Sequence, residues 1–220
     1  MEFSRTLNLE VNSFVQRLGA AVCEAIRKYD MRAVRDVVPA LGGLALHFDR
    51  DEFDGDVLAA AAELVELCLK QGLPLAEELG RNVEVAVCYE QQFALDMDEV
   101  SGKKGLSPAE IPKIHSSSEY RVLMMGFAPG HAYLGGLDAR LSVPRRATPR
   151  AVVPAGSVAI ANEQTVIYPY AIPGGWSVIG RTPLVVFDAA RESPSLFAAG
   201  DLVRFRAIGA REFAALAEKK

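Results

Sequence analysis

From residue 119 onward, the chain loses helical periodicity and consists of short apolar runs separated by glycine and proline. The runs include residues 152–153, 158–160, 166–168 and 184–187, and six prolines lie between or beside them. Because proline has no amide hydrogen to donate, it suits turns and strand edges but not a central strand. Short strands joined by such turns are typical of a closed or nearly closed β-barrel. We therefore predict an all-β barrel domain over residues 119–220.

The first 90 residues carry long periodic segments of a different kind. Apolar residues from Leu9 to Tyr29 recur at three- and four-residue spacing, which predicts an amphipathic helix. A strand before this helix would complete a split βαβ, ferredoxin-like layer. Because only residues 1–4 can supply that strand, we expect it to be very short. The predicted elements of this ferredoxin-like α+β domain, residues 1–90, are helix 9–29, the hairpin strands 34–38 and 44–48, helix 57–70 and strand 83–89.

Residues 91–118 are predicted to form a helical connector between the two domains. Ser107, Pro108 and Glu110 stand in the order of a helix start: a serine cap, a proline at the first helical position and a glutamate that reaches back to the cap. We expect the domain boundary within this connector, between residues 90 and 119.

Charge is distributed unevenly along the sequence. The 24 basic and 28 acidic residues give a net charge of −4, which disfavours a non-specific nucleic-acid binder. Between residues 121 and 187, however, six arginines accompany only two acidic residues and no lysine. Arginine without lysine indicates forked recognition of carboxylate or phosphate groups.

Cysteine usage and hydropathy predict a cytoplasmic protein. The three cysteines, Cys23, Cys68 and Cys88, lie outside metal or redox spacing, which favours buried free thiols in a reducing compartment. No signal-peptide pattern opens the sequence. No apolar run reaches the roughly 20 residues of a membrane helix, so we expect no membrane segment.

Familiar catalytic signatures are absent from the sequence. It contains no Walker A loop, no G-x-S-x-G elbow, no H-E-x-x-H and no C-x-x-C pair. Its three histidines, His47, His115 and His131, are far apart in the sequence, so we expect no metal site. A stand-alone hydrolase with an obvious nucleophile is therefore not supported.

A dense block of glycine, proline and aromatic residues fills positions 125–182. It contains G-F-A-P-G-H-A-Y-L-G-G-L (126–137), P-R-R-A-T-P-R (144–150) and P-G-G-W-S-V-I-G-R-T (173–182). With shorter matches at 37–39, 87–89, 114–115 and 119–122, these motifs resemble the 5-oxoprolinase B-subunit family. That family is also called allophanate hydrolase subunit 1, and it includes an inhibitor of a sporulation sensor kinase. The resemblance spans nearly the whole chain.

The resemblance implies a cyclophilin-like barrel in the second half and a hydrolase that works as a heteromer. The B subunit of 5-oxoprolinase would act with the C subunit, a related barrel protein, and with the A subunit, to hydrolyse 5-oxo-L-proline to L-glutamate using ATP. ATP with Mg²⁺ would be bound by the full complex, and this chain alone would be inactive. The alternative that the resemblance implies is a regulatory binding protein that inhibits a sensor histidine kinase.

The candidate site residues fall within or beside these motifs. The catalytic candidates are His115, His131 and Gln164. The candidates for substrate or phosphate binding are Phe127, Pro129, Gly130, Tyr133, Arg145, Arg146, Arg150, Tyr168, Gly174, Gly175, Trp176 and Arg181.

Several of these residues have plainer structural alternatives. The arginines of 144–150 could form surface salt bridges, Arg181 could join two barrel loops, and Trp176 could plug the barrel. His115 could interact with the end of the connector helix. The sequence departs from the family pattern where His131 replaces phenylalanine and where residues 162–163 replace two glycines, and both changes lie in the presumed site.

Overall fold

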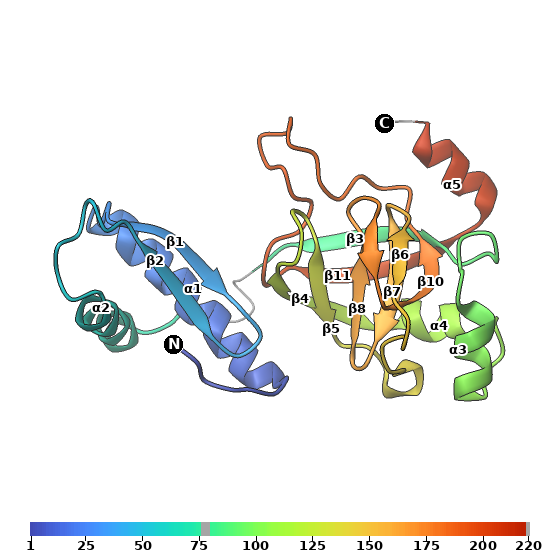
Figure 1. Ribbon diagram of the computed structural model, residues 1–220, viewed down its shortest axis with the longest axis horizontal. Coiled ribbons are helices and arrows are strands. Elements are labelled where there is room, and N and C mark those ends of the chain that lie inside the picture. Colours follow the sequence, from blue (N-terminus) through green and yellow to red (C-terminus); the bar gives the residue numbers. More distant parts are fainter. Residues whose placement is uncertain (76–79, 219–220) are drawn as a thin grey trace. The chain divides into compact units, whose positions relative to one another are not determined.

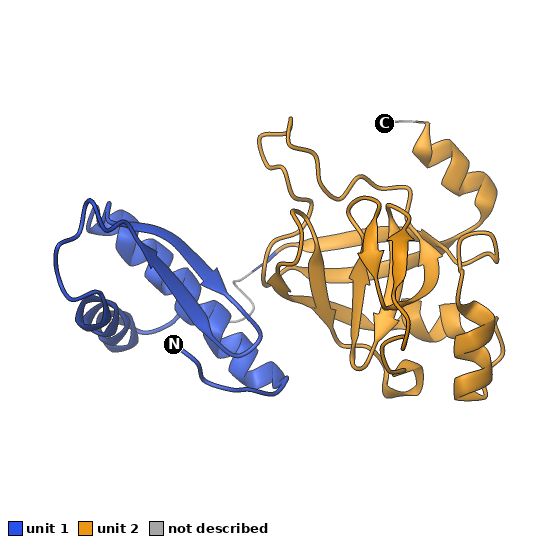
Figure 2. Cartoon of the chain, viewed as in Figure 1, with its two compact units in different colours: residues 1–80 blue, residues 81–220 orange. Residues whose placement is uncertain are grey.

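A computed structural model describes residues 1–75 and 80–218. The chain divides into two compact units, Met1–Gly80 and Arg81–Lys220 (Figure 2). Each unit is described separately below.

Among its described residues, unit 1 contains two helices and one β-hairpin, as the sequence predicts. Its elements are α1 (Leu9–Lys28), β1 (Val34–Pro39), β2 (Leu44–Phe48) and α2 (Val57–Gln71). The Asn8 side chain caps α1 by accepting hydrogen bonds from the amides of Glu10 and Val11. Leu18 on α1 and Leu44 on β2 are buried in a core shared with α2. The sheet of this unit is the antiparallel pair β1–β2.

The ferredoxin-like layer predicted for the first 90 residues is not confirmed. The stunted first strand is reduced to one bridge between Glu2 and Gly43. The strand expected at 83–89 is present as β3 (Asn82–Cys88), but it pairs in parallel with β11 (Leu202–Ile208) in the second unit. Its alternating apolar pattern fits any half-buried strand and cannot identify a partner more than a hundred residues away. The boundary between the two units therefore lies near residue 80 and not within 91–118.

Unit 2 is built around a closed seven-stranded barrel, which confirms the predicted barrel. The strand order is β10-β3-β11-β4-β5-β8-β7. Figure 1 labels these strands. Apolar side chains of these strands fill the interior. The remaining barrel strands are β4 (Glu119–Met125), β5 (Ala132–Gly135), β7 (Ser157–Ala161), β8 (Gln164–Ile167) and β10 (Ser177–Arg181). The unit also contains a short two-stranded sheet of β6 (Arg150–Val153) and β9 (Ile172–Gly174). A 3-10 turn (Ala139–Leu141) and the helix α5 (Ala210–Ala217) complete it.

The predicted connector forms two helices that belong to unit 2. These are α3 (Met97–Lys104) and α4 (Glu110–Ser117). Val100 and Ile111 are fully buried in the barrel's core cluster, so the helices cover the barrel rather than link two domains. The predicted helix start is confirmed only in part. The Glu110 carboxylate accepts hydrogen bonds from the amide and hydroxyl of Ser107, but α4 begins at Glu110, with Ala109 and not Ser107 at its N-cap.

One predicted strand is wrong. Residues 184–187 form no strand, and only Phe187 makes an isolated bridge, with Ser195. Val186 and Phe197 are instead buried by loop packing, which shows that an apolar run can mark core contact without strand pairing.

Among the described residues, no helix is both long and apolar enough to cross a membrane, and no group of three or more His, Cys, Asp or Glu side chains could hold a metal ion.

Candidate functional site

A pocket of about 260 Å³ brings nine of the predicted site residues together at one end of the barrel. The turn between β4 and β5, the start of β5, the loop before β6, the end of β8 and the turn after β9 each contribute to its wall. The Arg146 amide donates to the Gly175 carbonyl at 2.8 Å, which fixes two of these loops to one another. The lining residues are Phe127, His131, Tyr133, Arg145, Arg146, Pro149, Tyr168, Pro173, Gly174, Gly175 and Trp176.

The turn after β4 has an unusual backbone. Phe127 adopts a φ of 70°, a region that bulky side chains rarely enter, and 68% of its surface is exposed. Gly130 has a φ of 76°, and a Cβ there would lie 2.4 Å from the Cβ of Phe187. An aromatic side chain held exposed at the pocket wall by a strained backbone is a feature that clusters at functional sites.

His131 lies inside an aromatic cluster. Its ring centroid is 4.9 Å from that of Tyr133, 5.5 Å from that of Phe127 and 5.6 Å from that of Tyr168. Burial lowers the pKa of His131 to about 4, so the ring is neutral at neutral pH. Its buried Nδ1 has no hydrogen-bond partner among the described residues.

Arg145 supplies positive charge to this wall. Its guanidinium lies 5.6 Å from the ring centroid of Trp176, a cation–π distance. Burial raises the pKa values of Tyr133 and Tyr168, and the charge of Arg145 opposes both shifts. In the part of the chain that the structure describes, no carboxylate lies within ion-pair distance of Arg145. The side chain is exposed and free to bind an anion.

The other two arginines of this loop are committed to carboxylates. Arg146 and Arg150 both contact the buried Asp96, with nitrogen–oxygen distances of 2.7 Å. Arg146 also pairs with Glu99. For these two residues, the salt-bridge alternative describes their contacts better than the anion-binding hypothesis. Arg146 still lines the pocket, and its buried Nε has no partner among the described residues.

Asp96 is the functional residue that the sequence interpretation missed. Its carboxylate also accepts a hydrogen bond from the Val178 amide at 2.7 Å, and its own amide donates to the Val178 carbonyl. It therefore anchors the arginine loop to β10. In the sequence, an aspartate directly before a helix is typical of an N-cap, and nothing local indicates the two arginines some fifty residues later.

Six predicted site residues lie outside the pocket lining: His115, Gln164, Arg181, Pro129, Gly130 and Arg150. His115 is fully buried in the barrel core, where its Nδ1 is 2.8 Å from the Tyr89 hydroxyl and its Nε2 is 3.1 Å from the Thr165 hydroxyl. This burial lowers the pKa of His115 to about 3, and the residue has no access to the pocket. The catalytic role predicted for it is not supported.

Gln164 and Arg181 lie at strand ends outside the pocket lining, and the buried Nε2 of Gln164 has no hydrogen-bond partner among the described residues. Gln164 begins β8, at the opposite end of that strand from the pocket residue Tyr168. Arg181 ends β10 and donates from Nε to the Ala155 carbonyl at 2.7 Å, so it joins two barrel loops.

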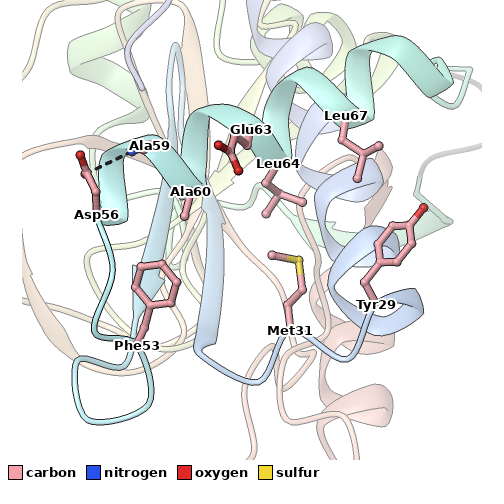
Figure 3. A pocket seen from close by; sticks show the side chains of 9 residues that line it. All are labelled: Tyr29, Met31, Phe53, Asp56, Ala59, Ala60, Glu63, Leu64 and Leu67. Carbon is pink, nitrogen blue, oxygen red and sulfur yellow. Dashed lines mark hydrogen bonds between the residues drawn. The ribbon is translucent and has the colours of Figure 1, made fainter.

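Unit 1 contains a larger hollow, of about 570 Å³. Figure 3 shows Phe53, Met31 and Leu64 pointing toward one another below α2, with Glu63 among the few polar side chains. No candidate site residue lies there, and its lining is mainly apolar. The barrel pocket is therefore the candidate functional site.

Comparison with known proteins identifies the family of this chain. The family described as carboxyltransferase domain, subdomain C and D, matches residues 1–197. The B subunit of 5-oxoprolinase from Bacillus subtilis (strain 168) is 36% identical over 226 residues, which cover the whole of this chain and 92% of that protein. The chain belongs to the 5-oxoprolinase B-subunit family.

Two solved structures show the same fold. This chain resembles TTHA0988 with a TM-score of 0.78 and 34% sequence identity. The match covers 96% of this chain but only 39% of the longer TTHA0988 chain. This chain also matches the conserved uncharacterized protein PH0987 from Pyrococcus horikoshii with a TM-score of 0.59 and 34% identity, covering 94% of that chain. The family fold therefore matches both a chain of similar length and one part of a longer chain.

Proposed function

We propose that this chain is the B subunit of an ATP-dependent 5-oxoprolinase, which hydrolyses 5-oxo-L-proline to L-glutamate together with the A and C subunits. The observation that carries the proposal is the match to the Bacillus subtilis 5-oxoprolinase protein along the entire chain. The barrel pocket supports it, because the wall combines an unpaired arginine with flat aromatic surfaces.

The pocket suits a small flat molecule with a carboxylate. The Arg145 guanidinium would pair with the substrate carboxylate in a forked, charge-assisted contact. Trp176, which is only 6% exposed, and Tyr133 would pack against the five-membered ring. Asp96 would act indirectly, because it holds Arg146 and the rest of the loop in position.

The barrel pocket, with a volume of about 260 Å³, is at the small end for a ligand pocket. When bound by the assembled enzyme, ATP would supply the phosphoryl group that activates an otherwise unreactive cyclic amide. We assign the ATP and Mg²⁺ contacts mainly to the partner proteins, so this chain alone would not turn over 5-oxoproline.

The proposal also covers the partner subunits, the cellular compartment and the type of barrel. The A and C subunits would assemble with this chain in the cytoplasm. The barrel would be of the cyclophilin-like kind, which carries no implication of prolyl isomerase activity, because a fold does not fix a function.

The test is reconstitution with the purified A and C subunits, measuring glutamate formed from 5-oxoproline with and without ATP. Arg145→Ala should reduce kcat/KM by about tenfold or more, and Arg145→Lys should restore only part of it, because lysine lacks the fork. Arg140→Ala is the matched control, since Arg140 is exposed in the same unit and pairs with Asp138 outside the pocket. Absence of ATP-dependent hydrolysis by the assembled complex would refute the proposal.

A further inference from the structure

The large hollow of unit 1 is a groove along one helix. One wall is the face of α2 from Ala59 to Leu67, which spans about 12 Å of helix. Figure 3 shows the opposite wall, where Phe53, Met31 and Tyr29 follow one another along α2. The hollow has a volume of about 570 Å³, and 46% of the Tyr29 surface is exposed. An apolar groove left open on a folded unit is a place where a partner can bury apolar surface.

The chain around this groove is strongly acidic. Between Asp49 and Glu66 there are seven acidic residues and one basic residue, Arg50. Two of the carboxylates, those of Asp56 and Glu63, line the groove itself. Among the described residues, no lysine, arginine or histidine lines it. The groove therefore has a negative rim, which favours a positively charged partner.

Three of the seven carboxylates have no ion-pair partner in the part of the chain that the structure describes. These are Asp51, Asp54 and Glu63. The other four are used inside unit 1, by the Arg35 and Lys70 side chains and by amides at the start of α2. The unpaired charge thus lies on α2 and on the loop that leads into it.

Two basic residues beside the opposite wall are already engaged. Lys28 lies 5.2 Å from the centroid of the Tyr29 ring, and Arg32 pairs with Asp30. Neither lines the groove, so they leave the charge of its α2 side unbalanced.

The groove suits a helix better than an extended segment. Backbone groups within α2 are paired inside that helix, so its wall offers no strand edge to a bound chain. Apolar side chains at i, i+4 and i+7 of a bound helix would span about 10 Å, close to the length of the groove. We propose that the groove binds an amphipathic helix of a partner protein. Its apolar side chains enter the hollow, and its flanking lysine and arginine side chains meet Asp51, Asp54 and Glu63. This docking surface goes beyond the proposed function and does not depend on the barrel pocket.

The probes for this surface are two synthetic peptides of about 15 residues, or four helical turns. Both carry leucine at i, i+4 and i+7. The basic peptide has lysine and arginine at the flanking positions, and the acidic peptide has glutamate at the same positions. Binding of each labelled peptide to the full chain is measured by fluorescence anisotropy. The natural chain should bind the basic peptide about tenfold more tightly, because like charges oppose binding of the acidic one.

Two matched pairs of variants locate the binding surface on α2. Ala59→Phe fills the groove with a ring, whereas Ala62→Phe places the same ring on an exposed position outside the lining. Ala59→Phe should weaken binding of the basic peptide about tenfold, and Ala62→Phe should leave it unchanged. Glu63→Lys should weaken it about fivefold and strengthen binding of the acidic peptide. Glu66→Lys, the same charge change outside the lining, should have a smaller effect. Circular dichroism checks that each variant keeps α2.

Equal binding of the two peptides, or no binding of the basic one by the folded chain, would overturn the proposal. Equal losses in the lining variants and in their controls would do the same. Sedimentation of the natural chain and of Ala59→Phe tests the other occupant, a second copy of this chain. A dimer that Ala59→Phe dissociates would show that a second copy fills the groove, and the proposed partner helix would be wrong.

Discussion

The two units differ in what lines their concave surfaces. Unit 1 has the larger hollow, about 570 Å³, lined by side chains such as Phe53, Met31 and Leu67. The barrel pocket has about 260 Å³, yet it gathers Arg145, the buried His131 and two tyrosines. Volume alone would select unit 1, which holds none of the candidate site residues. Convergent polar groups in an apolar wall identify a binding site better than size does.

Two helix caps of unit 1 and one buried carboxylate of unit 2 contrast local with distant hydrogen bonding. In unit 1, the helix caps Asn8 and Asp56 bind the backbone next to them in sequence. In unit 2, Asp96 binds Arg146 and Arg150 some fifty residues away, and its loss should affect that unit alone. The following predictions test this contrast, from the largest expected effect to the smallest.

Asp96→Ala should lower the free energy of unfolding of unit 2 by about 3–5 kcal/mol, because two arginines lose a buried partner. Urea unfolding followed by the fluorescence of Trp176, the only tryptophan, reports on this unit. Glu119→Ala removes an exposed pair with Arg204 and should cost no more than about 1 kcal/mol. Equal losses in the two variants would show that the buried carboxylate has no special role.

Leu18→Ala should destabilise unit 1 by about 2–5 kcal/mol, because Leu18 is fully buried in its core. Far-ultraviolet circular dichroism would detect loss of α1 and α2 at lower urea. The Trp176 fluorescence midpoint should not move if the units unfold independently. A parallel shift of both signals would instead show that they unfold as one cooperative unit.

Acid should weaken unit 2 through its two buried histidines. Burial lowers the pKa values of His115 and His131 to about 3 and about 4, from 6.5. Below pH 6.5 the unfolded chain therefore binds protons that the folded chain does not, so this stability is complete above pH 6.5 and declines as the pH falls toward 4. Each histidine should contribute about 1.4 kcal/mol per pH unit.

Urea unfolding at several pH values, again followed by Trp176 fluorescence, measures this slope. His131→Phe should remove about half of the histidine contribution. An unchanged slope in this variant would show that folding does not lower the pKa of His131.

Asn8→Ala should have the smallest effect, a loss of about 1 kcal/mol from unit 1. Asn8 Oδ1 accepts from the Glu10 and Val11 amides at 2.9 and 3.1 Å, and alanine leaves these amides to water. The circular dichroism transition should shift slightly while pocket binding stays the same. A change in 5-oxoproline affinity would contradict the separation of the two units.

Much of the pocket could be predicted from the sequence because its residues lie in three dense motifs. These motifs of glycine- and proline-rich turns contain eight of the nine predicted lining residues, among them Phe127, Arg145 and Trp176, whereas Tyr168 lies outside them. Such turns have local causes: proline fixes φ, and glycine permits close approach, as at Gly174, where a Cβ would lie 2.1 Å from the Tyr168 hydroxyl. His115, on α4, and Gln164, at the start of β8, are candidate residues that lie outside the pocket, because a local motif does not reveal where a side chain lies relative to distant parts of the fold.

By itself, the sequence determined α1 and α2, about half of the strands and the family, because periodicity, caps and turn residues act over a few neighbouring positions, but the all-β prediction for residues 119–220 missed α5. Only the tertiary structure decided that β3 joins β11 and that Asp96 occupies Arg146 and Arg150. It also decided that His115 lies in the core whereas His131 lies at the pocket. These outcomes depend on contacts between residues far apart in the chain, and no local pattern encodes which distant partner a strand or a charge will meet.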